Sequence, residues 1–419
     1  MSTAPPTDRD VGVYICRAII AAVLFVPVYL GARHGLLNLD DNPVLESALA
    51  GAFFIHMWTR PRRMEWASVL LIGAALSSIY AYLQHGFGHY LASAPSACAA
   101  FLGVASLTVL SLRSMAGEAA LRRSYRDTLL TASVFPYFSF PLAICLNLTT
   151  AFHPKVYDLL LYAFDESLGV RASYFIGQVM TASTPLKMVG ILVYQSMPLA
   201  ICALVALERS RPTRFPAGIL KLFIVTGLAG AILYNYFPAA GPIYMFGNRF
   251  PANLPAVADL TIHPVALASA ARNALPSVHF ACALLIWWNV ARLSLRWRLM
   301  AGVFLGMTML ATMGFGEHYL IDLVVAVPFA LAMQAVCLKS TSWASDDRRV
   351  AFSGGAALTV LWIAVLRLGL LQNSPPLAWC SVVATLALSL WWKRRLALGH
   401  RGFEQEIFPV GSVILAEKS

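Results

Sequence analysis

The sequence predicts an all-α integral membrane protein with about twelve transmembrane helices and both termini in the cytoplasm. Of the 419 residues, 59% are hydrophobic and only 12% are charged, about half the charged share of an ordinary soluble domain. The chain also contains about twelve apolar runs of the roughly 20 residues needed to cross a hydrocarbon core. Because these runs are continuously apolar and do not alternate with polar residues, they predict helices and not a β-barrel.

The predicted spans fall into three groups, which we expect to be three regions of the chain. Four spans lie in residues 1–125, six in a central region of residues 126–340, and two in residues 341–419. The polar stretches 113–127 and 339–349 separate the groups. In chain order the spans are centred near Ala22, Ala52, Ala75, Val104, Phe138, Pro198, Thr226, Leu284, Met307, Val327, Val360 and Ala384.

The basic residues predict the orientation of these spans. With a cytoplasmic amino terminus, most arginines and lysines lie in the tails and in the even-numbered loops. The odd-numbered loops carry only Arg33, Lys155, Arg171, Lys187, Arg249 and Arg272. This bias follows the positive-inside rule. It also explains the net charge of +11 by contact with anionic lipid headgroups, so we expect no nucleic-acid partner.

Two short motifs place ionisable side chains at the ends of apolar helices. The first, residues 274–279, contains Ser277 and His279, and the second, residues 316–322, contains His318 and Asp322. Only two predicted helices separate the histidines, so the hairpin returns both to one membrane face, opposite the cytoplasm. Because an ionisable group in a membrane segment is expensive unless it is paired or functional, the motifs suggest chemistry.

Each motif has a chemical interpretation that follows from its residues. Pro276 is expected at the first helical position, with Ser277 and His279 at a helix amino terminus that attracts anions. Arg272 adds a cation. In the second motif, the spacing of four between His318 and Asp322 on a helix would let the carboxylate orient the imidazole, whose other nitrogen could attack or exchange protons.

The two long loops of the central region complete the predicted site. The loop 152–187 contains a helical apolar face, with Asp158 and Asp165 on its flank and Gly169 at its end. That helix is either an interfacial lid or a solvent-capped connector. The loop 236–273 is rich in proline and glycine, which indicates a fixed, non-helical path, and it contains Arg249.

The motifs Pro276-Ser277-x-His279 and His318-x-x-x-Asp322 resemble the second and third signatures of the type-2 phosphatidate phosphatase superfamily. Within it, residues 274–279 and 318–322 look most like the branch that contains inositol phosphorylceramide synthases, and residues 157–165 and 237–240 add to that resemblance. The resemblance implies a six-helix core in which His318 forms a phosphohistidine, Asp322 orients it, His279 protonates the leaving oxygen and Ser277 binds phosphate.

The sequence departs from the superfamily at its phosphate-binding cations. The first signature, a lysine seven residues before an Arg-Pro pair, is absent, and Thr312 stands where the third signature usually has an arginine. Arg272 and Arg249 are the expected replacements. Because a phosphomonoester carries about two charges near neutral pH and a diester only one, fewer cations favour a diester substrate.

The sequence therefore predicts a lipid phosphotransferase, similar to inositol phosphorylceramide synthases, that moves a phospho-headgroup from a phospholipid donor to a lipid hydroxyl. The alternatives are a lipid phosphate phosphatase, of the phosphatidate or polyprenyl phosphate type, a proton-coupled transporter and a non-catalytic scaffold. We expect a multi-pass plasma-membrane protein, such as one of a bacterial inner membrane, with an extracytoplasmic site. No metal or other cofactor is expected, and the oligomeric state is left open.

Overall fold

The computed structural model describes residues 43–83, 87–116, 118–339 and 341–407, which are predominantly helical. The first predicted span, near Ala22, and both predicted cytoplasmic termini lie outside these residues. The chain divides into two compact units, with the division after Cys145. This division lies inside α5, near whose start the sequence predicts a boundary at residue 126.

The described part of the first unit contains four helices, the last of which continues into the second unit. They are α2 (Pro43–Trp58), α3 (Arg63–Leu83), α4 (Phe87–Ala116) and α5 (Ala119–Phe152). Helix α4 packs against both α2 and α3. Arg113 at the end of α4 forms an ion pair with Glu65 at the start of α3, at 3.1 Å. Tyr125 of α5 donates a hydrogen bond to the same carboxylate, so one buried glutamate joins three helices at one end.

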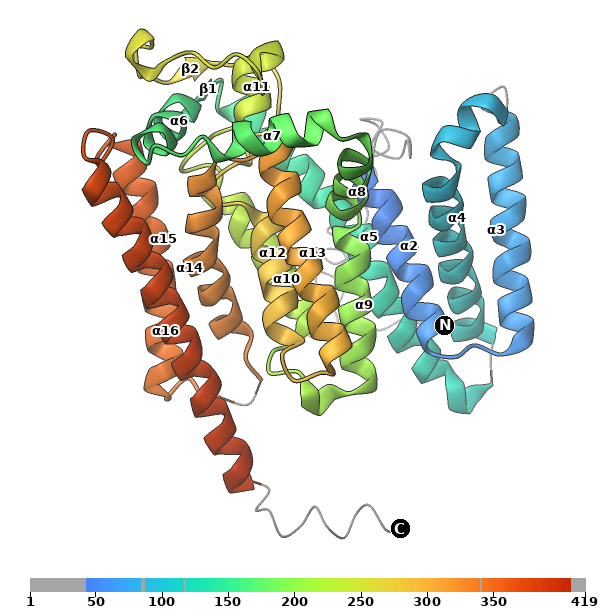
Figure 1. Cartoon of the computed structure of the whole chain (residues 1–419). Coiled ribbons are helices and arrows are strands. Elements are labelled where there is room, and N and C mark those ends of the chain that lie inside the picture. Colours follow the sequence, from blue (N-terminus) through green and yellow to red (C-terminus); the bar gives the residue numbers. More distant parts are fainter. Residues whose placement is uncertain (1–42, 84–86, 117, 340, 408–419) are drawn as a thin grey trace, which may run out of the picture. The chain divides into compact units, whose positions relative to one another are not determined.

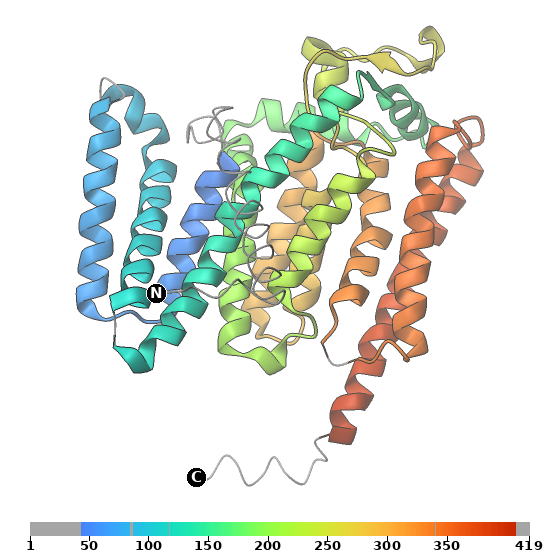
Figure 2. The same ribbon diagram turned by 180° about the vertical axis from the view of Figure 1, so that it is seen from behind.

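The second unit contains all the predicted site residues. Its longer helices are α8 (Thr184–Gln195), α9 (Met197–Ser210), α10 (Ile219–Leu233), α12 (Val278–Asn289), α13 (Leu295–Gly314), α14 (Leu320–Cys337), α15 (Asp346–Arg367) and α16 (Pro375–Ile407). Helix α14 is the most buried of them and contacts α10, α12, α15 and α16. The pair α15 and α16 stands beside α14 in both views of the molecule (Figures 1 and 2).

Short elements cover one end of this helical unit, which is the upper end in Figure 1. They are α6 (Asp158–Ser167), α7 (Ala172–Ala182), α11 (Pro242–Phe246), the turns η2 (Gly247–Arg249) and η3 (Val257–Asp259), and a two-stranded antiparallel sheet. In the sheet, β1 (Lys155–Val156) pairs with β2 (Val265–Ala266), with Lys155 opposite Ala266. The turn η1 (Pro212–Arg214) lies between α9 and α10.

The helices have the length and composition of a membrane protein. Seven of them could each cross a membrane, and α7 and α8 form a further apolar pair bent by 116°. Helices α2, α10 and α12 are apolar but shorter. The predicted all-α membrane fold is therefore confirmed. The count of twelve spans stays a prediction.

Helix α6 differs from both interpretations of the loop 152–187. It begins and ends almost where the pattern indicates, and Gly169 follows it with a φ of +68°. Its residues Asp158–Asp165 are all buried, however, because α6 packs against α11, α14, α15 and α16. It is thus neither an interfacial lid nor a solvent-capped connector, but part of the protein core.

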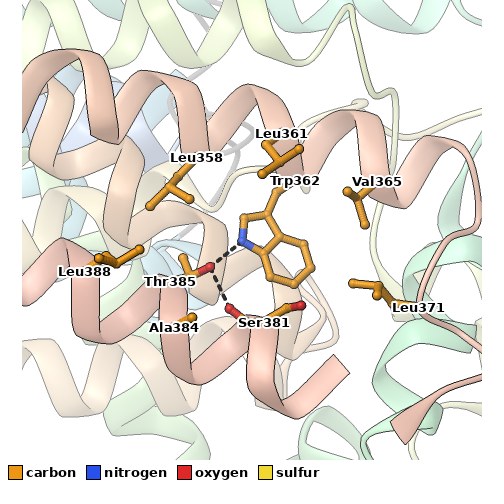
Figure 3. A pocket seen from close by; sticks show the side chains of 9 residues that line it. All are labelled: Leu358, Leu361, Trp362, Val365, Leu371, Ser381, Ala384, Thr385 and Leu388. Atoms are coloured by element: carbon orange, nitrogen blue, oxygen red, sulfur yellow. Dashed lines mark hydrogen bonds between the residues drawn. The ribbon is translucent and has the colours of Figure 1, made fainter. Parts of the chain in front are cut away.

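A small apolar pocket lies between α15 and α16 (Figure 3). Its volume is about 210 Å³. The Trp362 indole N–H donates a 2.8 Å hydrogen bond to the Thr385 hydroxyl, which donates to the Ser381 carbonyl. Because both polar groups have partners, the pocket presents mainly hydrocarbon to its interior.

Candidate active site

Ser277 joins the two motifs. It is the N-cap of α12, where its side-chain oxygen accepts a 3.4 Å hydrogen bond from the Phe280 N–H. Its own N–H donates to the main-chain carbonyl of Asp322, at 3.2 Å. The expectation that Pro276 opens the helix is wrong, because α12 begins at Val278. The anion-attracting N–H groups of the first helical turn therefore start one residue after Ser277.

His279 lies in the first turn of α12 with its ring plane fixed by an aromatic neighbour. The imidazole stacks on the Tyr194 ring of α8, with centroids 4.2 Å apart and planes inclined by 12°. Phe315 meets the same tyrosine ring edge-on at 6.1 Å. His279 also interacts electrostatically with His318. The structure therefore brings the two predicted histidines into one site.

His318 precedes α14 and is nearly fully buried. Its Nδ1 lies 2.9 Å from the carbonyl oxygen of Ala274. Since a carbonyl can only accept a hydrogen bond, Nδ1 carries the proton and Nε2 keeps its lone pair. The Asp322 carboxylate lies 3.4 Å from the same Nδ1. Burial lowers the pKa of His318 to about 4, against opposing effects of Glu317 and the Ala274 carbonyl.

The spacing of four suggests that His318 and Asp322 lie on one helix, but their contact does not arise in that way. Helix α14 begins at Leu320, and Tyr319 is its N-cap. The Asp322 Oδ2 accepts a 2.8 Å hydrogen bond from the Tyr319 N–H, which closes a capping box. Oδ1 of Asp322 is buried without a hydrogen-bond partner among the described residues. The Asp322 carboxyl group thus caps the helix and lies on the Nδ1 side of the imidazole.

The two predicted phosphate-binding arginines have different surroundings. Arg272 is completely buried. Its guanidinium donates to main-chain carbonyls, which are those of His153, Leu267, Ser269 and Ala270. These bonds tie the loop before α12 to the end of α5, so Arg272 does not point a free cation at the histidines. Arg249 is exposed at the end of η2.

Two buried aspartates of α6, which the sequence pattern placed on a polar flank, hold the site together. Asp158 accepts hydrogen bonds from the N–H groups of Ala240, at 2.9 Å, and Gly241, at 2.7 Å. Asp165 accepts from the N–H groups of Leu320, at 2.7 Å, and Ile321, at 3.1 Å. The only signal in the sequence is that the pair stands seven residues apart on one helix.

The two aspartates are ionisable groups in a low-dielectric surrounding. Desolvation raises the pKa of Asp158 to about 6, although the N–H groups of Ala240 and Gly241 oppose the shift. Desolvation also raises the pKa of Asp165 well above its ordinary value, and the interaction with Asp322 adds to the rise. Buried carboxyl groups persist only where several donors satisfy them. Helix α6 therefore holds the start of α14, two residues after His318.

Helix α11, which belongs to the loop 236–273, packs against the second motif. The Ile243 N–H donates to the Gly316 carbonyl at 2.9 Å, and the Tyr244 hydroxyl donates to Glu317 Oε1 at 3.0 Å. Gly241 has a φ of +109°, and a Cβ there would lie 2.4 Å from the Glu317 carbonyl oxygen. Glycine is therefore required where this loop approaches the motif.

The fold and the site together define a class of protein. It is a polytopic all-α membrane protein in which two histidines and an aspartate meet at one end of a helical unit. Within the described residues, no group of three His, Cys, Asp or Glu side chains is arranged to hold a metal ion.

Residues 159–336 match the family model described as the PAP2 superfamily. The match confirms the resemblance to type-2 phosphatidate phosphatases over somewhat less than half of the chain, a segment that contains Ser277, His279, His318 and Asp322. The superfamily is made up of phosphatases and phosphotransferases, so an activity of this general kind is supported. No curated protein and no solved structure matches the chain.

Proposed function

We propose that the protein is a plasma-membrane lipid phosphotransferase that moves a phospho-headgroup from a phospholipid to the hydroxyl of an acceptor lipid. One observation carries the proposal most directly. Ala274 and Asp322 hold Nδ1 of His318 on one side, and this leaves Nε2 with a lone pair in a site whose second histidine, His279, interacts electrostatically with His318. An oriented imidazole with one free nitrogen is what a histidine nucleophile requires.

The reaction proceeds in two displacement steps at phosphorus. Nε2 of His318 attacks the phosphodiester, the bond from phosphorus to the diacylglycerol oxygen breaks, and His279 gives that oxygen its proton. The headgroup phosphate is then bound to His318. In the second step His279 takes the proton of the acceptor hydroxyl, the hydroxyl oxygen attacks phosphorus, and the bond to His318 breaks. Atoms and protons balance, and no other reactant is needed.

Phosphate binding in this proposal depends on few charges. Ser277 and the first N–H groups of α12 form the anion site, and Arg249 is the one predicted cation with an exposed side chain. Arg272 stabilises the loop and does not bind the substrate, because its N–H groups donate to main-chain carbonyls. This scarcity of cations supports a diester, with one negative charge, over a monoester with about two.

The proposed location of the site is the extracytoplasmic face. The histidines lie at the starts of α12 and α14, and Figure 1 shows these helix starts at the end of the second unit that carries α6, α7 and α11. Nine basic residues lie in or beside the α9–α10, α12–α13 and α14–α15 connections, at the other end. These are Arg209, Arg211, Arg214, Arg292, Arg296, Arg298, Lys339, Arg348 and Arg349. A basic end is the cytoplasmic end under the positive-inside rule. The histidines also gather at one end and not at mid-membrane, which disfavours a proton-coupled transporter.

The proposal predicts transfer of radiolabel from a headgroup-labelled phospholipid to ceramide or diacylglycerol by the purified full-length protein. Phosphatidylinositol is the donor that tests similarity to inositol phosphorylceramide synthases. His318→Ala should abolish transfer, a fall of at least about 1,000-fold, because the intermediate cannot form. His263→Ala is the matched control, since this exposed histidine lies on the loop before Arg272 and contacts only the Thr261 carbonyl.

Three results would count against the proposal. Transfer that persists in His318→Ala would show that His318 is not the nucleophile. Release of free phosphate from a lipid monophosphate, without transfer from any diester, makes the protein a phosphatase. Absence of both reactions in the wild type rules out the enzyme.

A further inference from the structure

We propose that Glu317 determines substrate specificity. Together with Tyr244 it forms a headgroup subsite beside His318 that takes a headgroup bearing hydrogen-bond donors, an ammonium or hydroxyl groups, and rejects the dianion of a phosphomonoester. This inference rests on the proposed function and adds the headgroup chemistry to it.

Glu317 directly precedes His318 in the chain. Its carboxylate interacts electrostatically with the His318 imidazole and with Tyr194, the ring that stacks on His279. Its Oε1 accepts the Tyr244 hydroxyl at 3.0 Å. Glu317 is only partly buried, and among the described residues its Oε2 has no hydrogen-bond partner, so it can accept a bond from a ligand.

The backbone holds Glu317 in place, as a specificity residue requires. The N–H groups of Glu317 and His318 both donate to the Thr312 carbonyl, at 3.1 and 3.2 Å. On the other side, the Gly316 carbonyl accepts the Ile243 N–H of α11. A solvated surface glutamate would lack these constraints. The position of the carboxylate relative to His318 is therefore set by α11 and α13 together.

The ionisable side chains packed at the start of α14 are acidic. Asp322 lies beside His318, and Asp158 and Asp165 are buried in the neighbouring helix α6. Arg272, the predicted cation of the loop before α12, donates its guanidinium N–H groups to main-chain carbonyls. Where the superfamily usually has an arginine, Thr312 is buried and its hydroxyl donates to Met309 of its own helix. Adding Glu317 to this set makes the approach of a dianion unfavourable.

A phospholipid diester fits this arrangement better than a monoester. Its single negative charge lies at phosphorus, where Ser277 and the start of α12 provide N–H groups. Its headgroup extends away from phosphorus and can donate hydrogen bonds to a carboxylate. Rejection of the wrong substrate by an unpaired like charge is a recognised source of specificity. Glu317 therefore supplies the repulsive element and a hydrogen-bond acceptor at once.

The test compares donors in vesicles of matched composition, with the purified full-length protein and with Glu317→Gln. The donors are phosphatidylethanolamine, phosphatidylinositol and phosphatidate. The wild type should turn over one of the two diesters with a kcat/KM at least about tenfold above that for phosphatidate. In Glu317→Gln this ratio should fall about tenfold, because KM for the diester rises and phosphatidate is no longer repelled. Preference for phosphatidylethanolamine indicates an ammonium subsite, and preference for phosphatidylinositol indicates a hydroxyl subsite.

Glu166→Gln is the matched control. It removes a carboxylate of α6 that pairs with Arg171 and is not part of the proposed subsite, so the donor ratio should stay within about twofold of the wild type. An equal loss on all donors in Glu317→Gln would make Glu317 structural and would overturn the inference. If turnover depends on His318 but Glu317→Gln leaves the donor ratio unchanged, this inference is overturned and the proposed function is not. Turnover of no donor by the wild type overturns the proposed function as well.

Discussion

At the scale of single residues, the tautomer of His318 depends more on a main-chain oxygen than on its carboxylate partner. The Ala274 carbonyl lies 2.9 Å from Nδ1, and the Asp322 carboxylate lies 3.4 Å away and mainly caps α14. A carbonyl cannot release a proton, so the tautomer of His318 is the same in every protonation state of Asp322. Nε2, the proposed nucleophile, therefore keeps its lone pair over a wide pH range.

This geometry predicts an unusually low acid limit for the reaction. Because burial lowers the pKa of His318 to about 4, the imidazole stays neutral well below pH 6.5. Single-turnover formation of the phosphohistidine should keep its rate as the pH falls through 6.5 and should decline only towards pH 4. Glu317→Gln removes a charge that raises this pKa, so its decline should occur at still lower pH. A loss of rate centred near pH 6.5 would contradict the assignment.

The same shift links folding stability to pH. The unfolded imidazole, with a pKa near 6.5, binds its proton before the folded one does. Stability contributed by His318 is therefore complete above pH 6.5 and is lost as the pH falls towards about 4. His318→Ala should remove this dependence, and denaturant unfolding at several pH values measures it.

At the scale of elements, α6 acts as the clamp of the site through its two buried aspartates. Asp165 binds the first two N–H groups of α14. Asp158 binds the turn at residues 240–241 that leads into α11. Helix α6 thus positions both segments that meet at Glu317 and His318.

Asp165→Asn tests this clamp. The amide oxygen can accept only part of what two carboxylate oxygens accept, so the substitution should destabilise the protein by about 1–3 kcal/mol. As a positioning change it should lower kcat and leave KM nearly unchanged. Denaturant unfolding and steady-state kinetics on the same preparation measure both.

Glu166→Gln is the matched control for the clamp. Glu166 is the next residue of α6, and it pairs with the largely exposed Arg171 at 2.9 Å. An ion pair with one exposed partner contributes about 0–1 kcal/mol, so stability and kcat should stay close to those of the wild type. Equal effects of the two substitutions would show that α6 does not position the site through Asp165.

At the scale of the whole molecule, the separation of the site from the basic end predicts the topology. Asn253 lies on the exposed loop after η2, and Ser294 caps α13 at the opposite end without a side-chain hydrogen bond. In intact cells or spheroplasts, a membrane-impermeant thiol reagent should label Asn253→Cys and should label Ser294→Cys only after permeabilisation. The native chain gives the background labelling. The reverse pattern would place the site on the cytoplasmic face.

Much of the architecture and of the site follows from local patterns in the chain. Apolar runs predict helices because the period and length of a span are properties of neighbouring residues. The His318 and His279 motifs meet because a hairpin of two helices returns them to one end. These inferences need no knowledge of distant contacts. The existence and ends of α6 were predictable for the same reason.

Only the tertiary structure decided what each polar group binds. The Ala274 carbonyl that holds His318 is 44 residues away, and the Asp165 carboxylate is 155 residues from its partner Leu320. Arg272 has the charge of a phosphate ligand, but backbone carbonyls from 119 residues away and from its own loop occupy its donors. A hydrogen bond depends on position and direction in space, which sequence spacing does not encode across such distances. The sequence therefore determined that a histidine site lies at one end of a helical membrane protein, and the fold determined which atoms remain free to react.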